Sequence, residues 1–194
     1  MLGTLDARVR STGLPFATFR HGKGLYYYTN WAGGQVANQT YAQNRIVAHP
    51  TLIPYQTSIV EIGVWAVTGG GVGATTRLLI YGDTNSQPDY LIYDSGATAA
   101  TSTGVAIYFT AAPLPITLTP GTYWFGQLNQ GSATSVVVSG YTNANSYPIG
   151  CTTRQGTAQS TCGIYTDGWT GAPPANLTGI GPIASCGQYW IKTL

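Results

Sequence analysis

The chain has 194 residues, of which 43% are hydrophobic and 7% are charged, and its formal net charge is +2. An ordinary soluble domain carries about 25% charged residues, so the polar surface must be built largely from uncharged side chains. Disorder requires low hydrophobicity and high net charge, and the lack of a long apolar run excludes a membrane-spanning helix. Both alternatives conflict with this composition, which favours one folded domain with or without an arm.

Residues 1–22 are predicted to form an N-terminal arm, and residues 23–194 the folded domain. Half of the eight Lys and Arg residues occur before residue 24, opposed there by Asp6 alone; they are Arg8, Arg10, Arg20 and Lys23. A weakly basic arm of this kind is suited to attachment on an acidic partner. A solvated terminal segment is the alternative. The later cations are too scattered to follow a phosphate backbone, so we expect no nucleic-acid partner.

Short runs rich in Val, Ile, Thr and aromatic residues alternate with Gly and Pro, which is typical of an all-β fold. The expected strands, in chain order, are Tyr26–Tyr28, Arg45–Ala48, Ser58–Val67, Thr75–Tyr81, Tyr90–Tyr93, Val105–Thr110, Thr122–Leu128, Ser135–Ser139 and Gln188–Lys192. Residues 29–44 are predicted to be a loop, residues 82–85 a turn, and residues 140–185 long loops. The pattern predicts a two-sheet antiparallel β-sandwich of jelly-roll type.

Alternation along two of these strands assigns their faces. In the strand at 58–67, Ile62, Val64 and Ala66 share one face, and Glu61, Gly63, Trp65 and Val67 share the other. In the strand at 122–128, Tyr123 and Phe125 lie opposite Trp124.

Aromatic residues in the expected loops are the candidate contact residues. Tyr and Trp stack on sugar rings and anchor protein interfaces, and the candidates are Trp31, Tyr41, Tyr147, Tyr165 and Trp169. The alternative is that these rings cover the ends of the sandwich or pack between subunits.

No residue set with convincing catalytic, metal or cofactor chemistry is found. Oxygen ligands follow a calcium-loop spacing at Asp83, Asn85, Gln87, Asp89 and Asp94. However, Pro88 stands where that loop requires Gly, so turn chemistry is the favoured explanation and no metal is expected.

The remaining reactive side chains are predicted to be structural. Glu61 is expected to be a hydrogen-bonded acid within its strand, and His49, before Pro50, a surface turn residue. Cys151 and Cys162 either pair across a hairpin or stay reduced like Cys186. No nucleophile motif accompanies these groups, so we expect no enzyme.

Several turns and strands in order resemble a jelly-roll domain of tailed-bacteriophage virion structural proteins, over roughly residues 26–194. The segments that carry this resemblance are Ser58–Val64, Arg77–Pro88, Leu91–Gly96, Ser102–Val105, Leu118–Trp124 and Gly168–Pro174. The resemblance implies a sandwich located on a virion, often as a trimer, and built in the bacterial cytoplasm before assembly.

The expected function is therefore that of a non-enzymatic virion surface protein of the tail-fibre, receptor-binding type. Its partners would be other virion proteins and a host-surface glycan or protein. One alternative is a capsid decoration protein that binds the shell through the arm. A second alternative is a carbohydrate-binding module outside any virus.

Overall fold

The computed structural model describes residues 24–29, 35–110, 114–142, 163–183 and 185–194. These residues form fifteen strands, which are β1 (Tyr26–Tyr28), β2 (Gln35–Thr40), β3 (Arg45–Ile53), β4 (Thr57–Thr68), β5 (Thr75–Thr84), β6 (Gln87–Asp94), β7 (Thr98–Ala99), β8 (Val105–Phe109), β9 (Ile116–Leu118), β10 (Gly121–Gln130), β11 (Val137–Thr142), β12 (Gly163–Asp167), β13 (Gly181–Ile183), β14 (Ser185–Gly187) and β15 (Tyr189–Thr193). No helix of the described residues could cross a membrane.

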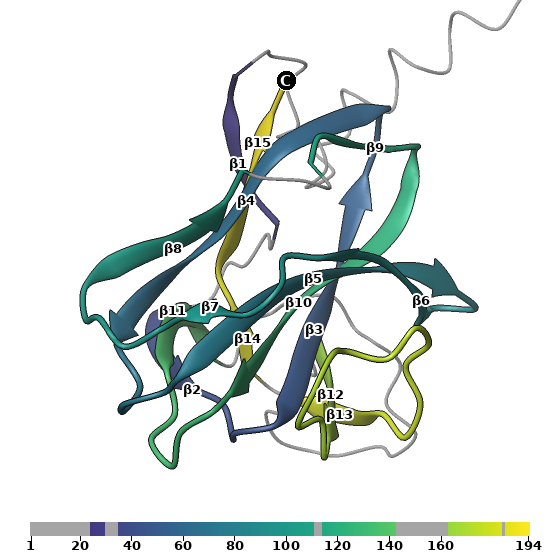
Figure 1. Cartoon of the computed structure of the whole chain (residues 1–194). Coiled ribbons are helices and arrows are strands. Elements are labelled where there is room, and N and C mark those ends of the chain that lie inside the picture. The colour runs from purple at the N-terminus through teal and green to yellow at the C-terminus, as the bar shows by residue number, and fades with distance from the viewer. Residues whose placement is uncertain (1–23, 30–34, 111–113, 143–162, 184) are drawn as a thin grey trace, which may run out of the picture.

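The strands form two antiparallel sheets that pack as a sandwich (Figure 1). Sheet A contains β1, β15, β4, β11 and β14 in that order, with β2 beside β11 and with β8 and β9 beside β4. Sheet B has the order β13-β12-β3-β10-β5-β6, with β7 beside β5. The predicted all-β, two-sheet antiparallel sandwich is confirmed, whereas its jelly-roll type stays a prediction.

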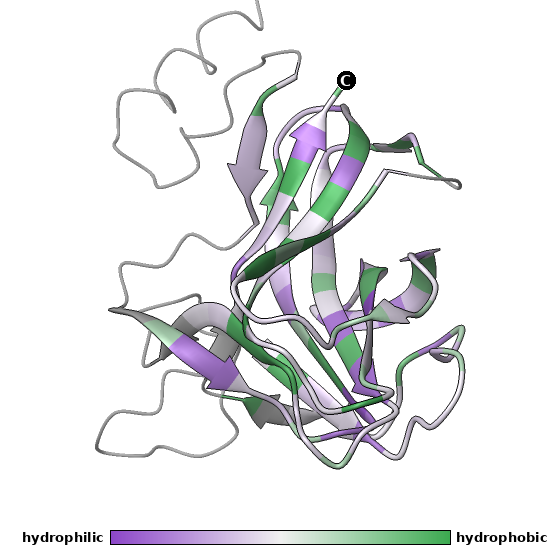
Figure 2. Cartoon of the chain, turned by 60° about the vertical axis from the view of Figure 1, so that its left-hand side comes forward, coloured by the Kyte–Doolittle hydropathy of each residue, from purple (hydrophilic) through white to green (hydrophobic). Residues whose placement is uncertain are grey.

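The core lies between the sheets, and alternation had separated its residues on β4 and β10 from those of the opposite face. Ile62, Val64 and Ala66 of β4 are fully buried in the same cluster as Tyr123 and Phe125 of β10. Trp65 of β4 and Trp124 of β10 belong to the outer faces of their sheets. Alternating hydrophilic and hydrophobic bands along the strands are visible in Figure 2. Period-two patterning therefore decided which half of each strand is buried.

Four local predictions need correction. Residues 35–40, expected within a loop, form β2, because their six residues pair with β11 over its whole length, although they lack apolar alternation. Residues 163–167 and 181–183, also expected in loops, form β12 and β13, which pair with each other.

The third correction concerns the turn predicted at residues 82–85. The β5 strand continues to Thr84, which pairs with Gln87, so the hairpin turn is Asn85-Ser86. Both residues have positive φ, 55° and 63°, as a two-residue type I′ turn requires.

Strand β3 runs through Pro50 instead of ending before it. The β3–β12 ladder covers Arg45–Ala48, so Pro50 lies beyond β12 and is paired with β10 on one side. Among the described residues the β3–β12 ladder ends at Ala48, so no described pairing on that side of the strand requires an amide hydrogen from Pro50. The strand consequently extends to Ile53 and brings His49 and Thr51 into the interior.

Candidate binding surface

The predicted contact residues do not form one surface in the described structure. Tyr41 is 1% exposed and belongs to the core cluster between the sheets, so its assignment as an exposed loop aromatic is wrong. The polar residues before Tyr41 resemble a loop in sequence, but residues 35–40 form β2, and Tyr41 follows this strand into the core. Trp31, Tyr147 and the arm residues Arg8, Arg10, Arg20 and Lys23 lie outside the described residues, as do Cys151 and Cys162.

Tyr165 is half-buried on β12, where the Arg45 guanidinium lies 4.2 Å from its ring centroid. Arg45 also donates two hydrogen bonds to Asp167, at 2.6 and 2.9 Å. The hydrogen bond from Arg45 lowers the pKa of Asp167. This ring is thus held by a cation of its own sheet.

Trp169 belongs to a segment, residues 168–180, that lies over the outer face of sheet B. We call this segment the strap. Trp169 is half-buried and packs with Ile180 against a second apolar cluster, formed on that face by Ile46, Ala48, Leu79, Tyr81, Trp124, Leu128, Ile164 and Leu177. Trp169 is therefore packed on the outer face of sheet B.

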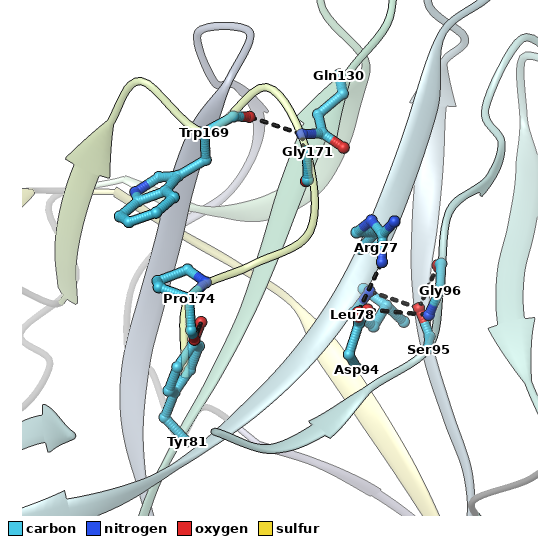
Figure 3. Close-up of polar contacts among 10 residues, drawn as sticks. All are labelled: Arg77, Leu78, Tyr81, Asp94, Ser95, Gly96, Gln130, Trp169, Gly171 and Pro174. Carbon is cyan, nitrogen blue, oxygen red and sulfur yellow. Dashed lines mark hydrogen bonds and ion pairs between the residues drawn. The ribbon is translucent and has the colours of Figure 1, made fainter. Parts of the chain in front are cut away.

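Hydrogen bonds fix the strap at several points (Figure 3). Gln130 Nε2 donates to the carbonyl oxygens of Trp169 and Gly171 at 2.6 and 2.8 Å. Tyr81 Oη donates to the carbonyl oxygen of Pro174 at 3.1 Å, and burial raises the pKa of this phenol. The strap is consequently attached to sheet B at three of its backbone carbonyl groups.

The acids with calcium-loop spacing are used by the protein itself. Asp83 accepts the indole N–H of Trp124 at 2.7 Å and the amide of Ser86 at 3.2 Å. Asp94 accepts from Arg77 Nη1 at 2.6 Å (Figure 3), and Asp89 accepts from Asn176 at 2.9 Å. The hairpin spreads these side chains along two strands, which supports turn chemistry over a calcium loop.

Exposed aromatic residues gather instead on the outer face of sheet A. Of the six exposed aromatic side chains in the described part of the chain, Tyr26, Tyr28, Trp65 and Tyr108 belong to this face, and Tyr55 and Tyr90 do not. With the half-buried Trp190, these four residues form what we call the aromatic face. Their strands β1, β4, β8 and β15 are neighbours in the sheet.

The register aligns the residues of this face in a row. Tyr28 pairs with Trp190, Trp190 with Gly63, and Gly63 with Tyr108. Directly paired residues of antiparallel strands project from the same side of a sheet, so the three rings share one face. Trp65 lies two residues beyond Gly63 on β4, next to the same row.

Trp190 is held in place by two features of β4. A Cβ at Gly63 would come within 2.1 Å of Cζ2 of the indole, so the indole occupies the space that a side chain at position 63 would fill. The indole N–H donates to Glu61 Oε1 at 2.9 Å, and Glu61 is buried. Glu61 is thus a hydrogen-bonded structural acid, as predicted.

A second row on the same face carries charge. Tyr26 pairs with Lys192, and Lys192 with Glu61. Lys192 Nζ lies 5.0 Å from the Tyr26 ring centroid, within the range of a cation–π contact. Glu61 and Lys192 are the two charged residues in the described strands of sheet A. The surface is therefore aromatic and close to neutral.

His49 is not a surface turn residue but a fully buried one. Its ring stacks on Tyr189 with centroids 5.1 Å apart, and burial lowers its pKa to about 3. Thr29 Oγ1 donates to the carbonyl oxygen of Tyr189 at 3.3 Å, so we assign the N–H to His49 Nε2, which donates to Thr29 at 3.1 Å. Continuation of β3 past Pro50 placed this ring inside, where it stabilises the fold as a neutral imidazole.

The sequence pointed to part of the aromatic face but not to the whole. Alternation on β4 had already placed Trp65 on the same face of that strand as Glu61 and Gly63. Tyr28, Tyr108 and Trp190 carried the same signal on their own strands, but their neighbourhood depends on strand order. No family model matches the chain, and no curated protein matches it in sequence.

Proposed function

We propose that the chain is a non-enzymatic surface protein of a bacteriophage particle, and that the aromatic face of sheet A binds the host surface. The observation that carries this proposal is the row of in-register aromatic side chains on a sheet face whose two charged residues, Glu61 and Lys192, are of opposite sign. The largest exposed apolar patch of a typical monomer measures about 300–600 Å² and is often functional. The resemblance to virion structural proteins supplies the setting.

The described acids form hydrogen bonds within the fold, which supports a binding role over a catalytic one. A hydrolytic pair needs two carboxyl groups facing one substrate bond. Each described acid instead has a partner within the fold, the pairs being Glu61–Trp190, Asp83–Trp124, Asp89–Asn176, Asp94–Arg77 and Asp167–Arg45. These carboxylates hold structural elements together, which agrees with a protein that recognises a surface without changing it.

Competition for phage adsorption tests the proposal. Purified full-length protein is expected to block adsorption of the phage to host cells, and the double variant Y28A/Y108A is expected to lose this effect. Tyr90→Ala is the matched control, because Tyr90 is about equally exposed but lies on β6 of sheet B.

Two results would contradict the proposal. One is equal blocking by Y28A/Y108A and wild type, which would remove the aromatic face from the contact. The other is a failure of the wild-type protein to block adsorption while antibody labelling of virions marks the capsid, which would favour the decoration alternative.

A further inference from the structure

We infer that the occupant of the aromatic face is a neutral oligosaccharide that lies across the strands, over Tyr28, Trp190 and Tyr108. This inference rests on the proposed function and specifies the chemistry of its ligand. It is carried by the spacing of the rings, by the charge of the face and by its area.

The spacing fits an extended chain of rings. Tyr28 and Tyr108 are separated by three strand intervals, since β1, β15, β4 and β8 are successive neighbours. At about 4.8 Å per interval, the row is about 14 Å long. A pyranose ring presents C–H groups on its faces and hydroxyls at its edges, so successive sugars can stack on a flat aromatic row while their hydroxyls remain in water.

The charge of the face favours a neutral ligand. Its two charged residues, Glu61 and Lys192, are of opposite sign and paired in register. Glu61 accepts the Trp190 N–H, and Lys192 lies by the Tyr26 ring. An acidic or basic polymer would therefore find no excess of opposite charge among the strands of this sheet.

The exposed area of the rings suits a small ligand. Tyr26, Tyr28, Trp65 and Tyr108 are 56, 58, 45 and 58% exposed. At roughly 200 Å² per aromatic side chain, they present about 450 Å². A standard protein interface buries about 800 Å² on each partner, so the rings alone would supply about half of one, whereas they are sufficient to cover a ligand of oligosaccharide size.

The central ring is fixed before binding. Gly63 leaves room for the Trp190 indole, and the Glu61 carboxylate fixes the indole by its N–H. A stacking platform that is already ordered avoids the entropy cost of immobilising a free side chain on binding.

Titration with defined sugars tests the inference. The probes are neutral hexasaccharides of glucose, galactose, mannose and N-acetylglucosamine, the matching disaccharides, neutral polysaccharide isolated from host cells, and an acidic oligogalacturonate. Binding to the full-length protein is followed by tryptophan fluorescence and calorimetry. At least one neutral hexasaccharide or the host polysaccharide should bind, at least tenfold more tightly than its disaccharide, because the longer chain covers the whole row.

Variants locate the site. Tyr28→Ala and Tyr108→Ala should each weaken hexasaccharide binding about three- to tenfold, the range expected for one aromatic contact, whereas Tyr90→Ala should leave it unchanged. Tyr28 and Tyr108 are exposed, so these variants should fold. Circular dichroism and thermal unfolding verify this.

Three outcomes would overturn the inference. They are binding of the acidic oligosaccharide alone, equal affinities for the face variants and the wild type, and no binding of any neutral probe. In one case no neutral probe binds, but the wild-type protein blocks phage adsorption and Y28A/Y108A does not. The ligand is then a protein, and the proposed function stands without this inference. If adsorption blocking is also unchanged in that variant, both fail.

Discussion

The indole of Trp190 stands directly over Gly63 of the neighbouring strand, 2.1 Å from where a Cβ at that position would lie. The two residues are paired in register, so the indole ring from β15 occupies the space that a side chain at position 63 of β4 would fill. Gly63 thus allows the indole to lie on the outer face of the sheet, and replacing this glycine should displace the indole.

Gly63→Ala should lower the free energy of unfolding by about 1–3 kcal/mol, as overpacking does. The new methyl group would push the indole outward and break its hydrogen bond to Glu61. Urea unfolding measures the stability, and the tryptophan emission spectrum reports the altered ring. Gly171→Ala is the control, because a Cβ there meets nothing within 4 Å. Equal stability of the two variants would show that Trp190 can move without cost.

His49 should make stability depend on pH in mildly acid solution. Its folded pKa of about 3 lies below the ordinary value of 6.5, so between these values the unfolded chain binds a proton that the folded chain does not. The stabilising effect is complete above about pH 6.5 and is lost as the pH falls toward 3, at up to about 1.4 kcal/mol per pH unit.

His49→Phe keeps a ring beside Tyr189 but cannot titrate. From pH 7 to pH 5, the wild type should lose about 2 kcal/mol more stability than this variant, as measured by urea unfolding. The carboxylates are common to both proteins, so their contribution cancels in the difference. Parallel pH profiles would contradict the assignment of a buried neutral imidazole.

Truncation of Tyr41 should lower the stability of the fold far more than truncation of Tyr108. Tyr41→Ala removes a ring from the core and should cost about 3–5 kcal/mol, whereas Tyr108→Ala removes an exposed ring and should change stability by about 0.5 kcal/mol or less. Thermal and urea unfolding compare the two variants. A small effect at Tyr41 together with a large effect at Tyr108 would reverse their assigned places.

The strap should loosen when Gln130 is shortened. Gln130→Ala removes the donor to the carbonyl oxygens of Trp169 and Gly171. The free energy of unfolding should fall by about 1–2 kcal/mol. Hydrogen exchange should increase at the amides of residues 168–180 and remain unchanged in β4. Faster exchange throughout both sheets would instead indicate global destabilisation.

The candidate site was predictable only in part. Alternation alone grouped Trp65 with Glu61 and Gly63 on one face of its strand, and Glu61 was recognised as a structural acid. Tyr41 was misplaced because the polar strand β2 resembles a loop in sequence. His49 was misplaced because a proline beside it suggested the end of β3.

By itself, the sequence determined that the chain forms an all-β sandwich and which face of β4 and β10 is buried. These properties follow from local alternation of apolar and polar residues. Only the tertiary structure decided that Tyr28, Trp190, Gly63 and Tyr108 form one row. Their strands come from both ends and the middle of the chain, and hydrogen-bond pairing between distant segments, which no local pattern encodes, sets their order.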